Sequence, residues 1–293
     1  MRIGLNYAPI RRNDQPLAAV LADRLGYSSL WYGEHVALPY DFDPSKYPGE
    51  SMTFDPDSII LDPFALLSFV AGTTQHVRLG TGITILPLHD PLITARTLVT
   101  MDMVSRGRID LGVGVGWNID EFEFCGRDFH SRGEILDEFL DVLDVLWSDV
   151  RPEHHGKHFD FRPIGFRPKP VQRPRIPVHV GGKGAASLRR AARFDGWYGA
   201  ADTPEAAAEI LGEIKRNREL VGTADQPFQF SVLLFWAPNE WQIEAYEAIG
   251  VDQLVVTPWE IRNPSNALER IEEYAQEIGL EPRAIGADAG AEP

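Results

Sequence analysis

The sequence predicts an α/β protein folded as a single (β/α)8 TIM barrel, with insertions after strand 2 and before strand 5. Short apolar or β-branched runs alternate with longer amphipathic segments along the whole chain, which is the pattern of βα units on a parallel sheet. Eight such pairs can be counted, and eight is the number that closes a barrel. At 293 residues, the chain has the length of one large barrel domain.

The first four units begin and end at residues that favour helix termini. Gly26 suits a left-handed C-cap after the first helix, and Gly107 closes the third. Asp62 and Asp90, each followed by proline, suit the N-caps of the second and third helices. The predicted strands are residues 2–7, 28–33, 77–86 and 108–117, and the predicted helices are 16–25, 63–74, 91–107 and 134–150.

The last four units follow a poorly periodic, proline-rich insertion at residues 149–175. The predicted strands are residues 176–182, 195–200, 228–236 and 252–259, and the predicted helices are 185–194, 203–221, 240–249 and 265–278. We therefore assign the barrel domain to residues 1–282. Residues 283–293 are small, polar and aperiodic, so we expect a mobile C-terminal tail.

Composition argues against several classes of partner. The formal net charge of -15 repels a nucleic-acid backbone. No stretch reaches the 18 or more apolar residues of a membrane span, and the first nine residues, MRIGLNYAP, have no signal-peptide architecture. The single cysteine, Cys125, excludes an intramolecular disulfide. We expect a cytoplasmic protein with a small-molecule substrate and with no nucleic-acid or membrane partner.

Two ionisable residues, Glu34 and His35, stand where the second strand ends. Barrel active sites lie at the carboxyl ends of the strands, and an imidazole there can give or take a proton near neutral pH. The alternative is a partly buried histidine that holds the following loop. Residues 36–61 form a long connection rich in proline and aromatic residues, which indicates either a substrate-covering loop or a wrong assignment. The well-defined flanking elements favour the covering loop.

Glycines recur on one face of two strands, at Gly80 and Gly82 and at Gly112, Gly114 and Gly116. Because glycine weakens a strand, this pattern indicates either a bulky group close to the backbone or tight packing layers in the barrel. The spacing is not that of a dinucleotide-binding fingerprint.

A further glycine-rich turn, residues 181–184, joins an apolar strand to a helix. It contains Gly181, Gly182, Lys183 and Gly184. Bare backbone N–H groups and the positive end of the helix meet there, which favours an anion such as phosphate. The alternative is a βα turn that simply requires glycine.

Other residues of reactive type give weaker signals. His154, His155 and His158 lie together, but adjacent histidines point in different directions and no second cluster has ligand spacing. We therefore expect a solvated insertion and no metal site. Cys125 has no basic neighbour that would activate its thiol, and no G-x-S-x-G motif for hydrolysis is present.

Taken together, these stretches resemble the luciferase-like monooxygenase superfamily, and within it the oxidoreductases that depend on the deazaflavin coenzyme F420. The matching stretches cover nearly the whole chain in order, and the most specific is S-x-G-R followed by LGVGVGW. They are LWYGEHVALP (30–39), LGTGITILPLHDPLITAR (79–96), VSRGRIDLGVGVGWNIDEFEFCG (104–126), RPKPVQRPRIPVHVGGKG (167–184), ARFDGW (192–197) and VDQLVVTPW (251–259).

The resemblance implies a cofactor ring across the strand ends, with His35 as the proton-transfer residue and Glu34 beside it. It places a bulge with a non-prolyl cis peptide at Gly82-Ile83 and the cofactor phosphate at the 181–184 turn. The cofactor contacts we expect are Tyr7, Thr81, Gly82, Ile83, Gly116, Trp117, Gly181, Gly182, Lys183 and Gly184. The substrate contacts we expect are Tyr40, Glu121 and Trp259.

The chain departs from the family at one informative position. Sugar-phosphate dehydrogenases of this superfamily place a glutamate directly after the glycine that ends strand 4, where this chain has Trp117. The departure argues against that activity. Glu121, one helical turn further on, is a candidate substitute acid.

The resemblance implies an oxidoreductase that moves a hydride between C5 of F420 and a small organic substrate, with His35 as proton donor or acceptor. The alternative is an FMN-dependent luciferase-like monooxygenase, because the two cofactors share a phosphoribityl tail. Arginine outnumbers lysine by 23 to 5, as expected of a protein from a GC-rich genome. F420 is common among actinobacteria, whose genomes are GC-rich, so this composition modestly favours F420. A third hypothesis is a barrel that only binds a ligand. Because relatives are often dimers, we expect a homodimer.

Overall fold

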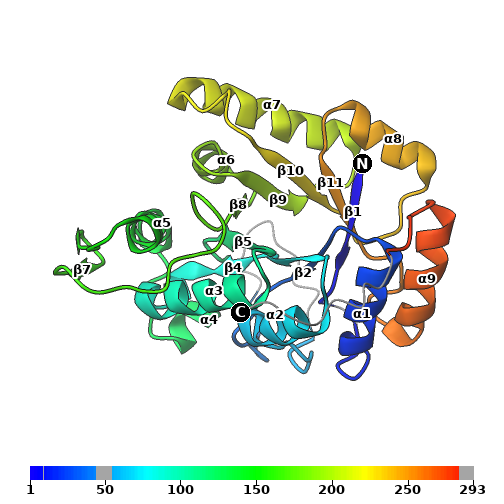
Figure 1. Ribbon diagram of the computed structural model, residues 1–293, viewed down its shortest axis with the longest axis horizontal. Coiled ribbons are helices and arrows are strands. Elements are labelled where there is room, and N and C mark those ends of the chain that lie inside the picture. Colours follow the sequence, from blue (N-terminus) through cyan, green and yellow to red (C-terminus); the bar gives the residue numbers. More distant parts are fainter. Residues whose placement is uncertain (9, 44–54, 284–293) are drawn as a thin grey trace, which may run out of the picture.

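The computed structural model, described for residues 1–8, 10–43 and 55–283, is a closed barrel of parallel strands surrounded by helices (Figure 1). The barrel strands are β1 (Arg2–Asn6), β2 (Ser29–Tyr32), β3 (Arg78–Thr81), β5 (Ile109–Gly114), β8 (Val178–Gly181), β9 (Gly196–Ala200), β10 (Gln229–Leu233) and β11 (Gln253–Val256). The order is β3-β2-β1-β11-β10-β9-β8-β5, and pairing of β3 with β5 closes the ring. The predicted (β/α)8 barrel is confirmed.

The helices form the outer layer. They are α1 (Gln15–Leu25), α2 (Pro63–Thr73), α3 (Pro91–Val104), α4 (Ile119–Phe124), α5 (Arg132–Ser148), α6 (Ala185–Ala191), α7 (Pro204–Val221), α8 (Glu240–Ala248) and α9 (Ala267–Glu277). In Figure 1, α7 and α8 lie above the strands, α2 and α3 below, α5 on the left, and α1 and α9 on the right. No helix of the described residues has the length and apolar content needed to cross a membrane.

Three of the four helix ends predicted from local sequence are confirmed; the fourth, Gly107, is wrong, because α3 ends at Val104 with Ser105 as its C-cap. The carboxylates of Asp62 and Asp90 accept hydrogen bonds from Ala65 N at 2.7 Å and Ile93 N at 2.9 Å. These bonds satisfy backbone N–H groups that the first turn of a helix leaves unpaired. Gly26 ends α1 with a φ of 93°, a conformation that glycine adopts without steric cost.

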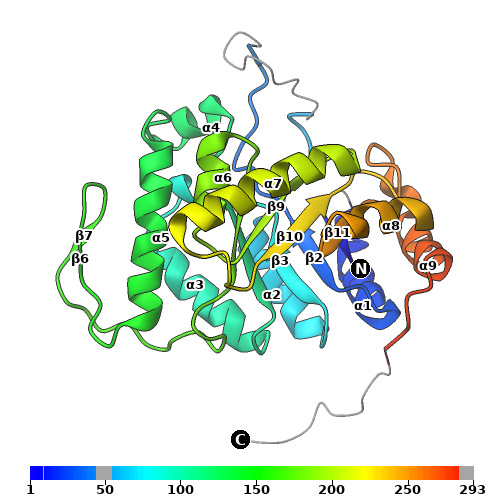
Figure 2. The same cartoon turned by 90° about the horizontal axis from the view of Figure 1, so that it is seen from above.

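Three local features differ from the predictions. The expected strand 77–86 is interrupted after Thr81, and a short strand, β4 (Thr84–Ile85), pairs separately with β5. Helix α4 was not predicted. The 149–175 insertion contains an antiparallel pair, β6 (His154–His155) and β7 (Asp160–Phe161), which lies outside α5 (Figure 2).

The histidines of this insertion are held by carboxylates. Glu138 of α5 accepts hydrogen bonds from the backbone N of His158 at 2.9 Å and of Phe159 at 2.8 Å. The same carboxylate lies 3.3 Å from His154 Nε2, and His155 pairs with Asp160 at 2.7 Å. Within the described residues, no three His, Cys, Asp or Glu side chains form a potential metal group. The contacts of Glu138 fasten the insertion to α5.

The interior of the barrel explains the glycines of its strands. Trp31 and Tyr198 stack there with ring centroids 4.3 Å apart. A Cβ atom on Gly80 would lie 2.5 Å from the Trp31 ring, and one on Gly82 would lie 2.8 Å from the Tyr198 ring. A Cβ on Gly112 would lie 1.9 Å from the carbonyl oxygen of Thr81. The two explanations predicted for these glycines, a bulky group near the backbone and tight packing layers, therefore both apply. The bulky groups are the chain's own aromatic side chains.

An ion pair between a partly exposed arginine and a buried aspartate lies at the amino-terminal ends of β3 and β5. The guanidinium of Arg78 donates two hydrogen bonds of 2.7 Å to Asp110, and His179 Nε2 lies 3.5 Å from the same carboxylate. Burial raises the pKa of Asp110, but the contacts with His179 and Arg78 outweigh it and lower the pKa to about 2. Of the two partners, Arg78 makes the closer contact.

We expect Asp110→Asn to lower the free energy of unfolding at pH 6 by about 2 kcal/mol. The folded-state pKa lies below the unfolded value, so the stabilisation is present above pH 4 and is lost as the pH falls toward 2. Urea unfolding at pH 6 and pH 3 should therefore show the gap between wild type and variant narrowing in acid. The exposed Asp225, changed to asparagine, is the control; equal gaps at both pH values would contradict this assignment.

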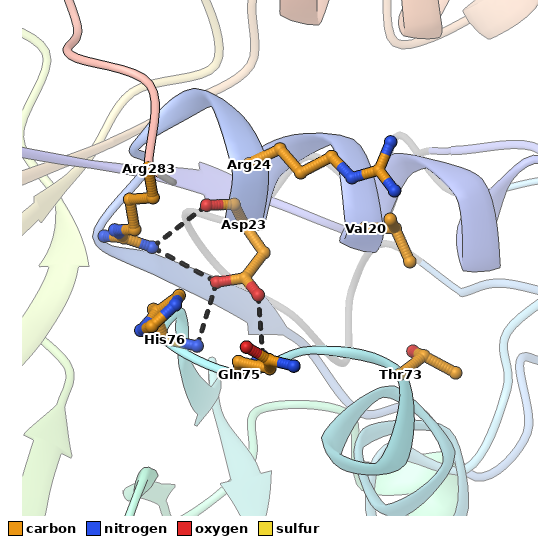
Figure 3. Close-up of a pocket in the computed structure, with 7 residues that line it drawn as sticks. All are labelled: Val20, Asp23, Arg24, Thr73, Gln75, His76 and Arg283. Atoms are coloured by element: carbon orange, nitrogen blue, oxygen red, sulfur yellow. Dashed lines mark hydrogen bonds and ion pairs between the residues drawn. The ribbon is translucent and has the colours of Figure 1, made fainter. Parts of the chain in front are cut away.

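At the amino-terminal face of the barrel, Asp23 joins three segments (Figure 3). Its carboxylate accepts hydrogen bonds from Gln75 N at 2.6 Å and Val77 N at 2.7 Å, in the turn before β3. Arg283 Nη1 lies 3.2 Å from Asp23 Oδ1. The segment after α9 is thus fastened to α1. Apart from Arg283, the predicted tail 283–293 lies outside the described residues, as does the middle of the predicted covering loop, residues 44–54.

Asp23→Ala should lower the free energy of unfolding by about 1–3 kcal/mol, because it leaves one buried and two partly buried backbone N–H groups without this acceptor. Thermal unfolding followed by circular dichroism measures the effect. Arg24→Ala is the matched control, since the Arg24 side chain lines the same hollow but points away from the Asp23 carboxylate in Figure 3. A loss of stability as large for Arg24→Ala would contradict the role given to Asp23.

Candidate functional site

A cleft of about 510 Å³ opens at the carboxyl ends of the strands. Its walls are mostly apolar, with a few polar groups, which is the usual character of a small-molecule site. The strand-end residues that line it come from far apart in the sequence. They are Asn6, Gly33, Glu34, His35, Gly82, Ile83, Gly116, Trp117 and Leu233. The residues that follow β2 and β3 line this cleft together, whereas the 181–184 turn, which was predicted to belong to the same site, does not line it.

His35 lies at this cleft and is held by a buried acid. Its side chain is 13% exposed, and its Nδ1 lies 3.1 Å from Oε2 of Glu121, which is 1% exposed. The other carboxylate oxygen of Glu121 accepts a hydrogen bond from Val36 N at 2.7 Å. The imidazole also packs edge-on against Trp117, with centroids 5.8 Å apart. The structure is therefore compatible with both alternatives raised by the sequence. The histidine is anchored, as a loop-holding residue would be, and it also faces a cleft, as a proton-transfer residue would.

Glu34 points toward the strand-3 bulge. Its carboxylate accepts a hydrogen bond from Ile85 N at 2.6 Å and lies 2.8 Å from Nε2 of His89. Its backbone N donates to the carbonyl oxygen of Ile83 at 3.3 Å. Glu34 is buried at 8% exposure and fixes the end of β2 to the segment around β4. Its predicted place among the catalytic residues stays a prediction.

The bulge has the predicted backbone. The Gly82-Ile83 peptide bond is cis, and both residues line the cleft. Ile83 packs over the neighbouring strands, since a Cβ on Gly114 would lie 2.2 Å from its side chain and one on Gly181 would lie 3.0 Å away. The Ile83 side chain therefore lies between the end of β5 and the start of the 181–184 turn.

The 181–184 turn begins beside the cleft. Gly181 is buried against Ile83, and Gly182 has a φ of 98° with its carbonyl accepting a hydrogen bond from Trp197 Nε1 at 2.9 Å. Lys183 and Gly184 are exposed. Phosphate binding at this turn stays a prediction, and the positive φ at Gly182 supplies an independent reason for glycine there.

Nine predicted contact residues lie outside the cleft lining, namely Glu121, the four residues of the 181–184 turn, and Tyr7, Thr81, Trp259 and Tyr40. Tyr7 is fully buried and donates to the carbonyl oxygen of Gln15, and Thr81 donates to Gly112 O at 2.7 Å. Trp259 is 5% exposed in the hydrophobic core. Tyr40 is 75% exposed and hydrogen-bonded to Asp57. Their roles as ligand contacts stay predictions, and the structure assigns Tyr7, Thr81 and Trp259 packing positions.

The cleft also contains residues that the sequence did not single out. Asn6 ends β1, Gln15 begins α1, and Leu233 ends β10. The strand-end rule could have identified Asn6 and Leu233, because every barrel strand points its carboxyl end at this face. Ile59 and Ile60 contribute from the predicted covering loop. The part of that loop nearest to α2 thus lies at the cleft, as its function would require.

Comparison with known proteins gives a consistent family match. A model of the luciferase-like monooxygenase family matches residues 4–290. An uncharacterized protein of Mycobacterium tuberculosis is 30% identical over 244 residues, which cover 82% of this chain and 83% of that protein.

Two solved structures show the same fold. The coenzyme F420 dependent tetrahydromethanopterin reductase from Methanopyrus kandleri has a TM-score of 0.75 at 16% identity and covers 96% of this chain and 99% of its own. The oxygenating constituent of 3,6-diketocamphane monooxygenase from Pseudomonas putida, in complex with FMN, has a TM-score of 0.71 at 15% identity and covers 97% and 100%.

Proposed function

The chain belongs to the luciferase-like monooxygenase family, and from this premise we propose that it is an F420-dependent oxidoreductase. It moves a hydride between C5 of the deazaflavin and a small organic substrate. The observation that carries the proposal is an anchored imidazole, His35, at the mouth of a largely apolar cleft. Hydride transfer to or from a carbonyl or alcohol carbon is accompanied by a proton on oxygen, and this proton needs a donor or acceptor.

The chain's own residues have separable tasks in this proposal. His35 gives or takes the proton through its Nε2 atom, because Nδ1 is engaged by Glu121. Glu34 keeps the end of β2 and the Gly82-Ile83 bulge together. Trp117 and Leu233 form apolar walls that exclude water from the reacting atoms.

The volume of the cleft supports a small redox ring as its ligand. This volume, about 510 Å³, lies within the range of small-molecule sites. Gly82, Ile83 and Trp117 would hold the ring, and the backbone N–H groups of the 181–184 turn would hold the phosphate. When bound, the deazaflavin supplies the two-electron chemistry, and the protein supplies position and electrostatics. The F420 dependence of the Methanopyrus kandleri reductase supports this choice of cofactor.

Titration of the purified protein with F420 and with FMN tests the proposal. We expect fluorescence changes that saturate at micromolar F420, with FMN binding more weakly. The matched variant Ile83→Ala should weaken binding of F420, because this side chain lines the cleft, whereas the exposed Leu220→Ala on α7 should not. Micromolar binding of FMN without binding of F420 would overturn the assignment.

The second candidate is an FMN-dependent monooxygenase. It is favoured by the FMN-bound Pseudomonas putida enzyme, whose likeness also covers nearly the whole chain. In that case oxygen would be a co-substrate, and His35 would donate or accept a proton in the oxygenation in place of the proton that accompanies the hydride. Oxygen consumption that depends on reduced FMN and on an added ketone or aldehyde would favour this candidate.

We also propose that the protein is a homodimer. Three apolar side chains are exposed on the neighbouring helices α2 and α3, namely Phe69 at 54%, Ile93 at 70% and Met103 at 47%. A contiguous exposed apolar patch is typical of protein contacts, and we propose that these three side chains belong to such a patch. Light scattering should give about twice the chain mass of 32.8 kDa, and Ile93→Asp should shift it to the monomer. A monomeric wild-type protein at tens of micromolar would contradict the proposal.

A further inference from the structure

The carboxylate of Glu121 bridges two donors of the His35–Val36 segment. Oε2 lies 3.1 Å from His35 Nδ1, and Oε1 accepts the Val36 N–H at 2.7 Å. We propose that Glu121 is a positioning residue that selects the Nδ1–H tautomer of His35 and so directs the lone pair of Nε2 at the reacting group. The inference rests on the proton-transfer role proposed for His35, and it replaces the substitute-acid role that the sequence suggested for Glu121.

The tautomer follows from the nature of the partners. A carboxylate oxygen offers only an acceptor to Nδ1, so the hydrogen of this contact belongs to the imidazole. In the neutral ring the second nitrogen, Nε2, then carries the lone pair. The ring can therefore accept a proton at Nε2, and once charged it can return that proton at the same atom. A group that fixes the ring from behind in this way orients the base without touching the substrate.

Glu121 is itself well fixed for this task. Its side chain is 1% exposed, and the bond to Val36 N prevents the carboxylate from rotating away from the ring. It stands in the first turn of α4, which begins after the N-cap Asn118, whose side chain accepts from Asp120 N at 3.1 Å. The short helix thus serves to deliver one buried acid to the end of β2.

The variant Glu121→Gln distinguishes tautomer selection from simple packing. Glutamine has nearly the same shape, and its oxygen must face Val36 N, because an NH2 group there would oppose another donor. The NH2 group is then left to donate to His35 Nδ1. The hydrogen of the neutral imidazole moves to Nε2, and the ring presents a donor where the wild type presents an acceptor.

Long-range 15N–1H correlation spectra of the cofactor-free protein measure this directly. With His35→Asn used to identify the signals, we expect wild-type His35 to have a pyrrole-like Nδ1 and a pyridine-like Nε2 at alkaline pH. Glu121→Gln should exchange the two signatures while the Val36 amide signal shows that its hydrogen bond is kept. The control Glu123→Gln, on the exposed side of α4, should leave the wild-type pattern unchanged.

Two outcomes overturn the inference. One is a wild-type His35 that carries its hydrogen on Nε2, which is decisive even if Glu121→Gln fails to fold. The other is a folded Glu121→Gln variant with the wild-type tautomer. Because these spectra need no cofactor, they can fail while F420 binds as proposed, and they can succeed if the protein binds FMN instead. With either cofactor, turnover by Glu121→Gln should fall by about 100-fold or more.

Discussion

His35→Asn is expected to lower kcat by about 10²–10⁴-fold, the range that a positioned general acid or base contributes. Asparagine preserves a polar side chain at the cleft but cannot exchange a proton near neutral pH. Its amide can still donate to the Glu121 carboxylate, so the local structure should survive. Binding of F420 should change little, since no charged cofactor group requires the imidazole in the proposed arrangement.

Turnover is measured by the absorbance of F420 with a panel of small secondary alcohols, ketones and enones. The matched control is His76→Asn, an exposed histidine in the turn before β3, at the opposite face of the barrel. It should retain wild-type kcat. A His35→Asn variant that binds F420 and turns over at the wild-type rate would contradict the proton-transfer role, whichever substrate of the panel is used.

Local sequence predicted those parts of the fold whose cause is local. The N-cap carboxylates of Asp62 and Asp90 and the left-handed Gly26 act on backbone groups within a few residues. The helix ends that they define can therefore be predicted from the neighbouring residues in the sequence. The alternation of strand and helix gave the barrel for the same reason, because closure follows from counting the units. The family resemblance added the position of the cis peptide at Gly82-Ile83.

What the sequence could not predict depends on pairs of residues far apart in the chain. Glu121 and His35 are separated by 86 positions, and only the closed barrel brings them together. Asn118 followed by two acidic residues is an N-terminal helix signal, and it could have identified α4. The same signal does not reveal that Glu121 faces His35, because α4 is too short to define a buried face by periodicity.

The strand glycines illustrate a second limit. The sequence indicated that something approaches the backbone at Gly80 and Gly112, but the group could have been a ligand or part of the chain. The structure identifies it as Trp31 and the Thr81 carbonyl. A pattern of strand glycines therefore does not by itself tell whether a ligand or a side chain of the protein approaches the backbone. The two cases can be distinguished only when the group that contacts each glycine is known.

Gly112→Ala is expected to destabilise the protein more than Asp110→Asn or Asp23→Ala. We expect it to lower the free energy of unfolding by about 3 kcal/mol or more. The added Cβ would lie 1.9 Å from the Thr81 carbonyl oxygen and 3.3 Å from the Trp31 ring. The first contact is with backbone, so no side-chain rotation relieves it. Thr81 and Gly112 lie at the β3–β5 seam that closes the barrel, and the seam must open to admit the methyl group.

Urea unfolding followed by tryptophan fluorescence measures this loss, and limited proteolysis serves if the variant is only partly folded. Gly72→Ala is the matched control, because a Cβ at that position in α2 meets nothing within 4 Å. It should raise stability by about 0.5–1 kcal/mol through helix propensity. If Gly112→Ala is as stable as the wild type, β3 and β5 can separate without cost, and the close packing assigned to this seam is wrong.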